Sequence, residues 1–483
     1  SQLILYLRQI LALLILATVC YSQNSSSIHQ LQSEYYNINY LSHEQYDTTE
    51  IIQPISTRSR PNSKEVFGYH PYWMGTAWTN YNFELISTLA FFSAEINATG
   101  SIDNLHGWPI PSLINQAHAH GTKVVLVATL FDSNDLITLL SNHSYKQNLI
   151  NNLIAQVQLG NADGVNIDFE SLPASQRDNM IDFIQNLTSA FHSTIPGSEV
   201  TIATPAVDWN NAWDYNALAT ISDGLFIMGY SYHWGGSTIS GPVAPLAGPG
   251  YTLTWTLNDY LNKTNYQIDK LILGCPYYGF EWPTSSSFPG ANTTGIGVAK
   301  FYSEIEGLAL SYGKRWHESS QTPWYAYENN SWNQGWYDDS LSLSLKYDFA
   351  LLNELKGIGI WALGYDGNRS ELWNLLNAKF GEESLLKTSK LIELDSLTIY
   401  PNPANNSFTV NYSALNNNHA SQISINNILG EEIYSILLPT NKTHLTWTWH
   451  GFNNNGNPVP NGIYFISIQN GNQIQTKKVT LLK

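Results

Sequence analysis

Acidic and amide side chains recur at every second position of one otherwise apolar stretch, Asp163 to Glu170, which reads DGVNIDFE. Such alternation is typical of a β-strand, in which successive side chains point to opposite faces. Asn166, Asp168 and Glu170 therefore share one face, while the apolar residues between them point into packed hydrocarbon. Two neighbouring carboxyls on a buried face repel when both are ionised, so one keeps a proton at neutral pH. A carboxyl that stays protonated is a candidate general acid.

The stretch also occupies a position that suits an active site. It follows a segment with helical patterning and ends at Ser171-Leu172-Pro173, which places Glu170 at the carboxyl end of the predicted strand. Active sites of parallel α/β folds form at that end. The alternative interpretation is a strand whose polar face is merely solvated.

The elements around this stretch predict an α/β fold, a (β/α)8 TIM barrel. Eight strand-like segments alternate with helical segments, a pattern typical of a closed parallel sheet. The interval from Tyr278 to Lys356 is too long for one helix, so we expect a small α+β insertion between strands seven and eight. The predicted strands are Val66 to Tyr69, Leu85 to Phe92, Lys123 to Leu130, Asp163 to Glu170, Glu199 to Ala206, Gly224 to Tyr230, Lys270 to Tyr277 and Gly357 to Leu363.

The composition narrows the class of ligand. The chain of 483 residues carries 38 acidic and 22 basic side chains, a formal net charge of -16, and it has no basic run. This balance argues against nucleic acid and anionic membranes as partners. Aromatic residues make up 13% of the chain, which suits a large core or a neutral, ring-shaped ligand such as a sugar.

The segments outside the barrel divide the rest of the chain. We expect a signal peptide over residues 1–22, because its apolar run is too short for a comfortable membrane span; a membrane helix and a lipoprotein at Cys20 are the alternatives. Residues 23–63, rich in Ser, Asn, Gln and Tyr, predict a linker or loosely attached arm. The barrel would cover residues 64–380, a second linker 381–393, and an all-β sandwich 394–483.

The barrel region resembles glycoside hydrolase family 18, the chitinase family, whose signature D-G-x-D-x-D-x-E stands here as DGVNIDFE. Supporting motifs follow in the family's order: Met228-Gly229-Tyr230, Gly274-Cys275-Pro276-Tyr277-Tyr278-Gly279 and Ile360-Trp361-Ala362. The segment Trp336-Tyr337-Asp338-Asp339 is similar to one in the branch that includes spore peptidoglycan N-acetylglucosaminidases.

The resemblance implies substrate-assisted retention, in which the sugar's own 2-acetamido oxygen attacks the anomeric carbon. It implies that Glu170 is the general acid and base, and that Asp168 binds the acetamido N–H and stabilises the oxazolinium. Tyr230 would orient the acetamido oxygen, and Trp361 would form the apolar floor beneath the sugar. Further substrate contacts are expected at Asn166, Met228, Tyr278, Trp282 and Tyr69. No metal and no cofactor is expected, and the protein is expected to be a monomer.

Two departures from the family pattern keep other functions open. Asn166 replaces the middle Asp of the signature, so the tuning of Asp168 is expected to rest on an amide hydrogen bond. Ser231 stands where the family usually has Asp, which favours a catalytically weak or inactive glycan-binding protein as the alternative to a secreted glycosidase. An endoglycosidase acting on the chitobiose core of N-glycans would use the same residues.

The C-terminal region resembles the type IX secretion sorting domain of Gram-negative bacteria. It begins with Tyr400-Pro401-Asn402-Pro403 and closes on the basic Lys477-Lys478-Val479. The resemblance implies the type IX machinery as a partner, export through the periplasm and a secreted or cell-surface location, without an integral membrane span. A carbohydrate-binding sandwich is the alternative. The expected substrate is a polysaccharide containing N-acetylglucosamine, such as chitin, chito-oligosaccharides or peptidoglycan, cleaved at β-1,4 linkages.

Overall fold

The computed structural model describes residues 26–39, 50–56, 64–381, 396–413, 421–438, 444–470 and 473–482. The predicted signal peptide and nearly all of the predicted linker 381–393 lie outside these ranges. The chain divides into two compact units, Ser1–Gly381 and Glu382–Lys483, and each is described by itself.

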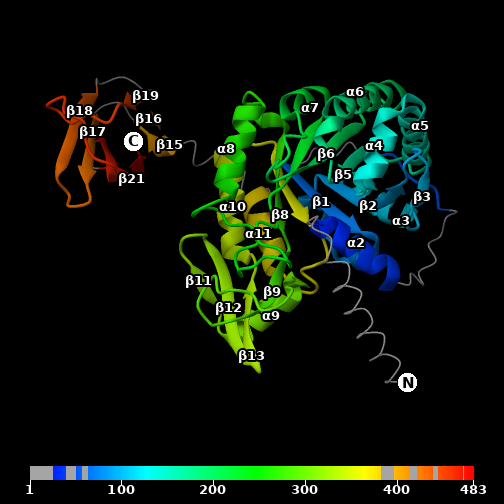
Figure 1. Cartoon of the computed structure of the whole chain (residues 1–483). Coiled ribbons are helices and arrows are strands. Elements are labelled where there is room, and N and C mark those ends of the chain that lie inside the picture. The colour runs from blue at the N-terminus through cyan, green and yellow to red at the C-terminus, as the bar shows by residue number, and fades with distance from the viewer. Residues whose placement is uncertain are drawn as a thin grey trace. The chain divides into compact units, whose positions relative to one another are not determined.

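The first unit is built around a closed barrel of eight parallel strands (Figure 1). β1 pairs with β2 on one side and with β14 on the other, and this double pairing closes the sheet. The predicted (β/α)8 barrel is therefore confirmed. The barrel strands are β1 (Glu65–Pro71), β2 (Thr88–Ile96), β4 (Lys123–Leu130), β5 (Gly164–Phe169), β6 (Glu199–Pro205), β7 (Gly224–Met228), β8 (Leu271–Pro276) and β14 (Gly357–Trp361). A short strand, β3 (Ile102–Asn104), pairs antiparallel to β2.

Helices surround the barrel and bury its outer face (Figure 1). They are α3 (Pro111–Ala119), α4 (Ser133–Ser141), α5 (His143–Leu159), α6 (Arg177–Thr194), α7 (Tyr215–Ile221), α8 (Leu253–Lys263), α10 (Ser340–Leu352) and α11 (Glu371–Phe380). In the part of the chain that the structure describes, none of the helices has the length and apolar character to span a bilayer.

The alternation of β5 sets the two faces of its barrel wall. Phe169 points outward and stacks on Phe183 of α6 at a ring distance of 5.8 Å. Asn166 points inward, where its amide reaches Tyr69 of β1 and Thr201 of β6. The period-two pattern of the sequence thus separates hydrocarbon packing from polar chemistry.

One large ring fills the barrel interior beneath this polar layer. Phe226 of β7 is fully buried, and its ring lies 4.9 Å from that of Tyr69. A Cβ added to Gly359 would lie 2.0 Å from the Phe226 ring, and one added to Gly274 would lie 2.6 Å from it. Glycine at these two positions therefore makes room for the ring that supports Tyr69.

A five-stranded antiparallel sheet is inserted between β8 and β14, as the sequence predicted. Its strands run in the order β10, β9, β13, β12, β11, and α9 packs against β9 and β12. The elements are β9 (Tyr278–Thr284), β10 (Val298–Phe301), α9 (Tyr302–Tyr312), β11 (Arg315–His317), β12 (Thr322–Asn329) and β13 (Ser331–Trp336).

The second unit is all-β, as predicted, with seven strands in the order β18, β17, β20, β21, β15, β16, β19. Apolar side chains, among them Val410, Ile425 and Ile466, form a core of its own. The strands are β15 (Ser396–Asn405), β16 (Ser407–Ser413), β17 (Ser421–Asn427), β18 (Glu432–Leu438), β19 (His444–Trp449), β20 (Gly462–Asn470) and β21 (Gln473–Leu482).

The structure differs from the sequence analysis between residues 23 and 63. A helix, α2 (Ile28–Asn39), lies where a linker or loose arm was predicted, and it packs onto the barrel. Its buried residues are Ile28, His29, Gln32 and Ser33, so three of the four are polar. Apolar periodicity could not reveal this helix, because the face that it buries is mostly polar.

Candidate active site

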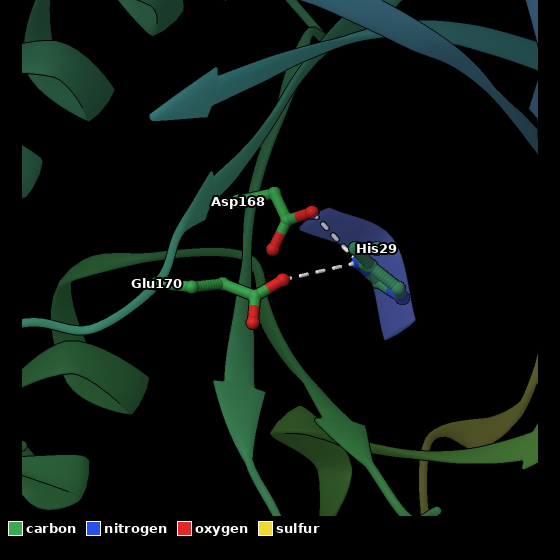
Figure 2. A group of neighbouring side chains, drawn as sticks. All are labelled: His29, Asp168 and Glu170. Atoms are coloured by element: carbon green, nitrogen blue, oxygen red, sulfur yellow. Dashed lines mark hydrogen bonds and ion pairs between the residues drawn. The ribbon is translucent and has the colours of Figure 1, made fainter. Parts of the chain in front are cut away.

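The sequence-predicted residues Asp168, Glu170, Tyr230 and Trp361 lie together at the carboxyl ends of three barrel strands. Asp168 is on β5 and Glu170 directly follows it, Tyr230 follows β7, and Trp361 ends β14. All four contact one further ring, His29 of α2. Figure 2 shows His29 pointing from α2 toward the two carboxyls. Four elements far apart in the sequence therefore meet at one point.

The two carboxyls form a buried pair. Asp168 is fully buried and Glu170 is 7% exposed. Burial raises the pKa of Asp168 to about 8. It also raises the pKa of Glu170 to about 8, and the neighbouring Asp168 charge adds to that rise while His29 opposes it. Among the described residues, neither Asp168 Oδ1 nor Glu170 Oε1 has a hydrogen-bond partner, so a proton held by the pair can be shared between them.

The His29 ring is held at both nitrogens. Nδ1 lies 2.7 Å from Asp168 Oδ2, and Nε2 lies 2.7 Å from the Tyr230 hydroxyl. Burial lowers the pKa of His29 to about 4, against the attraction of Glu170. The ring is therefore neutral at neutral pH, with one donor and one acceptor. In the tautomer that carries its proton on Nδ1, the ring donates to the Asp168 carboxylate and accepts from the Tyr230 hydroxyl at Nε2.

Aromatic side chains enclose the same ring. His29 stacks on Trp361 with a centroid distance of 3.6 Å and an interplanar angle of 24°. Tyr69 and Phe92 lie edge-on to it at 5.4 and 5.8 Å. The face of the Trp361 ring is thus a flat apolar surface with polar groups at its edge. A sugar ring can bind to a surface of this kind.

A second residue of α2 binds the edge of this floor. The Gln32 side-chain oxygen accepts a hydrogen bond of 2.9 Å from Trp361 Nε1 and one of 2.8 Å from the Tyr365 hydroxyl. Trp73 Nε1 in turn donates to the Tyr365 hydroxyl at 3.1 Å. Tyr365 was not predicted from the sequence, and it follows β14 by only four residues.

His29, Asp168 and Glu170 each offer one atom that could bind a metal ion, and these atoms lie within 4.8 Å of one another. The 2.7 Å between His29 Nδ1 and Asp168 Oδ2 is a hydrogen-bond distance. Two ligands held tetrahedrally at about 2.0 Å from a zinc ion lie roughly 3.3 Å apart. The described geometry is therefore that of a hydrogen-bonded cluster and does not fit a metal centre.

Asn166 contacts different partners from those expected. Its side-chain oxygen accepts from the Tyr69 hydroxyl at 2.8 Å, and its nitrogen donates to Thr201 at 2.9 Å. Neither of these bonds goes to Asp168, so the expected hydrogen bond from this amide to Asp168 is wrong for the described residues. Asn166 and Tyr69 instead form a buried layer beneath the carboxyl pair.

Ser231 and Tyr278 bind each other beside Tyr230. Their hydroxyl oxygens lie 2.8 Å apart, and the ring of Tyr278 lies 6.0 Å from that of Tyr230. Ser231 adopts a left-handed conformation with φ of 62°. Met228 ends β7 and is 9% exposed. A contact of Tyr278 or Met228 with substrate stays a prediction.

Trp282 lies in the inserted sheet. It is fully buried, and its Nε1 donates to the backbone oxygen of Trp234 at 3.1 Å. A Cβ added to Gly297 would lie 2.3 Å from the same nitrogen, so backbone packs closely on this ring. The structure gives Trp282 a packing role, and a substrate contact by it stays a prediction.

The outer half of α2 makes further contacts that the sequence analysis missed. Tyr36 stacks on Trp73 at 4.8 Å, with planes only 13° apart. Asn37 donates to Glu95 at 2.6 Å and accepts from the Tyr72 hydroxyl. A helical spacing of His29, Gln32 and Tyr36 was the one available signal, and it lay in a segment without apolar periodicity.

Two family models match the chain. Glycosyl hydrolases family 18 matches residues 65–366, which is more than half of the chain. The secretion system C-terminal sorting domain matches residues 398–481.

Individual relatives agree with the first match. The putative sporulation-specific glycosylase YdhD of Bacillus subtilis is 28% identical over 306 residues, covering 58% of this chain and 68% of that protein. Human di-N-acetylchitobiase is 27% identical over 339 residues, covering 62% of this chain and 81% of that protein. The crystal structure of a family 18 chitinase from Cycas revoluta in complex with (GlcNAc)3 superposes with a TM-score of 0.60 at 19% identity, covering 66% of this chain and all of that one.

The signature strand, the closed barrel and the family match agree, so the chain belongs to glycosyl hydrolases family 18, is a glycoside hydrolase, and carries a secretion system C-terminal sorting domain.

Proposed function

We propose that this protein is a secreted, retaining glycosidase that hydrolyses β-1,4 linkages beside N-acetylglucosamine in chitin, chito-oligosaccharides or peptidoglycan. One observation carries the proposal: a carboxyl pair, a tyrosine hydroxyl and a tryptophan face from three strands converge on a single ring position. A pyranose on the Trp361 face would place its 2-acetamido group between Asp168 and Tyr230.

Glu170 acts as the general acid in this scheme. Its raised pKa keeps it protonated at neutral pH, so it can donate a proton to the leaving glycosidic oxygen. Asp168 accepts the acetamido N–H, and Tyr230 donates to the acetamido oxygen as that oxygen attacks the anomeric carbon. The C–O bond to the leaving sugar breaks as the oxazolinium ring closes.

The second half of the reaction restores both groups. Glu170, now ionised, takes a proton from water, and the water oxygen attacks the anomeric carbon and opens the oxazolinium. The negative charge of Asp168 stabilises the positive oxazolinium in between, in a site from which Trp361 and Phe92 help exclude water. Two displacements at the same carbon retain its configuration.

Export is the second part of the proposal. The sorting-domain match to residues 398–481 supports recognition by type IX secretion machinery and delivery through the periplasm to the outside of a Gram-negative cell. The relatives support the substrate class, since they include a human di-N-acetylchitobiase and the cortical fragment-lytic enzyme of Bacillus subtilis.

A glycan-binding protein with weak or no turnover is the second candidate, and Ser231 is the observation that favours it. Its hydroxyl binds Tyr278, where the family signature usually supplies a carboxylate. Binding without turnover would need only the Trp361 floor and the acetamido contacts.

The test measures hydrolysis of 4-nitrophenyl β-N,N'-diacetylchitobioside and of purified peptidoglycan. It compares the full chain with Glu170→Gln, each also in a His29→Ala background that frees the ring position. We expect Glu170→Gln to lower turnover by about 10²–10⁴-fold. Equal hydrolysis rates for the full chain and for Glu170→Gln would refute the proposed enzymatic activity. Tight binding of chitotriose without turnover would favour the second candidate. Hydrolysis of fully deacetylated polymer would refute the acetamido mechanism.

A further inference from the structure

We propose that α2 is an autoinhibitory plug in which the His29 side chain imitates the acetamido group of the substrate, so that the protein is latent until α2 leaves the barrel. We call α2 (Ile28–Asn39) the plug helix. The imitation rests on the proposed function, whereas the position of the plug helix is described by the structure itself.

The first argument is the order of donors and acceptors. An amide presents an N–H and a carbonyl oxygen separated by one carbon, and a neutral imidazole presents an N–H and a bare nitrogen separated by one carbon. Nδ1 of His29 is bound by Asp168 and Nε2 by Tyr230, each at 2.7 Å. These are the groups that the proposed reaction assigns to the acetamido N–H and oxygen. One ring therefore occupies both positions that the substrate needs.

The second argument is steric. The imidazole lies 3.6 Å from the Trp361 ring at 24°, which is contact distance for two flat groups. The same face cannot hold a pyranose while His29 is there. Glu170 Oε1 also lies 3.5 Å from His29 Nδ1, so the general acid faces the plug helix and not a glycosidic oxygen.

The third argument is that the plug helix is anchored along its length by side chains of the site. Gln32 satisfies two buried donors, Trp361 Nε1 and the Tyr365 hydroxyl. About one turn further along the helix, Tyr36 stacks on Trp73 and Asn37 binds Glu95. The contact is therefore a specific fit across about two helical turns, and not a chance insertion of one ring.

The fourth argument concerns reversibility. Three of the four buried residues of the plug helix are polar, and water or substrate hydroxyls can replace their hydrogen bonds. Residues 40–49 separate the plug helix from Glu50, whose side chain accepts from Asn115 on the outside of the barrel. The eight barrel strands pair with one another, so departure of α2 leaves the barrel closed.

The first experiment measures kcat/KM on the chromogenic chitobioside for the full chain and for three variants. His29→Ala removes the imitating ring, and Gln32→Ala leaves two buried donors unpaired whenever the plug helix is bound. Ile38→Ala is the matched control, because that side chain lies on the same helix and is 68% exposed. We expect His29→Ala and Gln32→Ala to raise kcat/KM by at least about tenfold, as loss of a buried hydrogen bond predicts, and Ile38→Ala to leave it unchanged. Equal rates in all four proteins would overturn the inference.

The second experiment reads the plug helix directly, by hydrogen exchange of the backbone amides of residues 28–39. We expect protection in the wild-type chain and in Ile38→Ala, and loss of protection in His29→Ala and Gln32→Ala with the barrel strands unchanged. Chitotriose added to Glu170→Gln should also remove the protection. If no protein hydrolyses or binds any chito-oligosaccharide, the proposed function fails, but protection lost only in the two variants still supports docking. An unprotected helix in the wild-type chain would overturn the plug.

Discussion

Removal of a buried lysine beside the site gives a prediction whose size and pH dependence can be worked out. Lys346 of α10 forms an ion pair with Asp338, and both side chains are fully buried. Asp338 lies close enough to Tyr278 and Cys275 to affect their pKa values. Burial raises the pKa of Asp338, and Lys346 is the largest opposing influence. Lys346→Met keeps the hydrocarbon stem and removes the charge, so Asp338 must stay ionised without its partner or take up a proton.

Protonation sets an upper bound on the cost. Moving a carboxyl from an unfolded pKa of about 3.9 to a protonated form at pH 7 costs about 4 kcal/mol, at 1.36 kcal/mol for each pH unit. The folded pKa is raised above the unfolded one, so the folded variant binds a proton that the unfolded chain lacks. Its stability deficit against wild type is therefore largest at high pH and shrinks as the pH falls toward 4. At pH 5 the bound is roughly 1.5 kcal/mol.

The matched variant, Asp338→Asn, leaves the Lys346 ammonium buried without a counterion. An unpaired buried charge costs about 3 to 5 kcal/mol of folding stability, and this deficit does not grow as the pH rises toward 8, unlike that of Lys346→Met. The double variant has no buried charge, and its deficit is expected to be small and independent of pH.

Urea denaturation followed by tryptophan fluorescence between pH 5 and pH 8 measures these free energies of unfolding. Urea is used because it does not screen charge. The reasoning would be refuted if the stability deficits of the two single variants changed with pH in the same way. It would also be refuted if both deficits stayed below about 1 kcal/mol at pH 7.

Two further predictions follow from the site and the core. In the His29→Ala protein, kcat/KM should fall as the pH rises through the pKa of Glu170, because the general acid must be protonated; burial in the barrel and the neighbouring Asp168 charge raise that pKa above its ordinary value, so a falling limb near pH 4 to 5 in the pH–rate profile would contradict this. Phe226→Ala should lower the free energy of unfolding by about 3 to 5 kcal/mol in urea, because Gly359 cannot fill the space that the ring leaves; a loss below about 1 kcal/mol would show that the barrel interior collapses around the cavity.

The barrel could be predicted from the sequence because its signals are local. Strands such as Gly164–Phe169 show a clear alternation of polar and apolar residues. The regular alternation of strands and helices along the chain is compatible with few topologies. The grouping of Asp168 with Tyr230 and Trp361 came from motif order along those strands. The partners of the Asn166 amide could not be predicted, because Tyr69 reaches it only across the closed barrel and Thr201 only through the register of β5 with β6.

The plug helix escaped prediction for a different physical reason. His29 and Gln32 are buried although they are polar, because the surface that receives them is itself polar. Hydropathy measures the match between a side chain and hydrocarbon, and it carries no information on complementary hydrogen bonds. The segment therefore has the composition of a linker, although its side chains form hydrogen bonds with Asp168, Tyr230 and Trp361.

The closure of β14 onto β1 has a consequence for the order of folding. Trp361 is on the last barrel strand, 193 positions after Asp168 in the numbering, so the ring floor joins the carboxyl pair only when the barrel closes. Such long-range pairings form late and slowly. The plug helix binds groups on β5 and β14 and on the residues that follow β7, so it cannot settle before those strands have met. The plug helix precedes the whole barrel in the sequence but takes its place only after the barrel has closed, so the barrel has a complete but unguarded site for the interval between the two events.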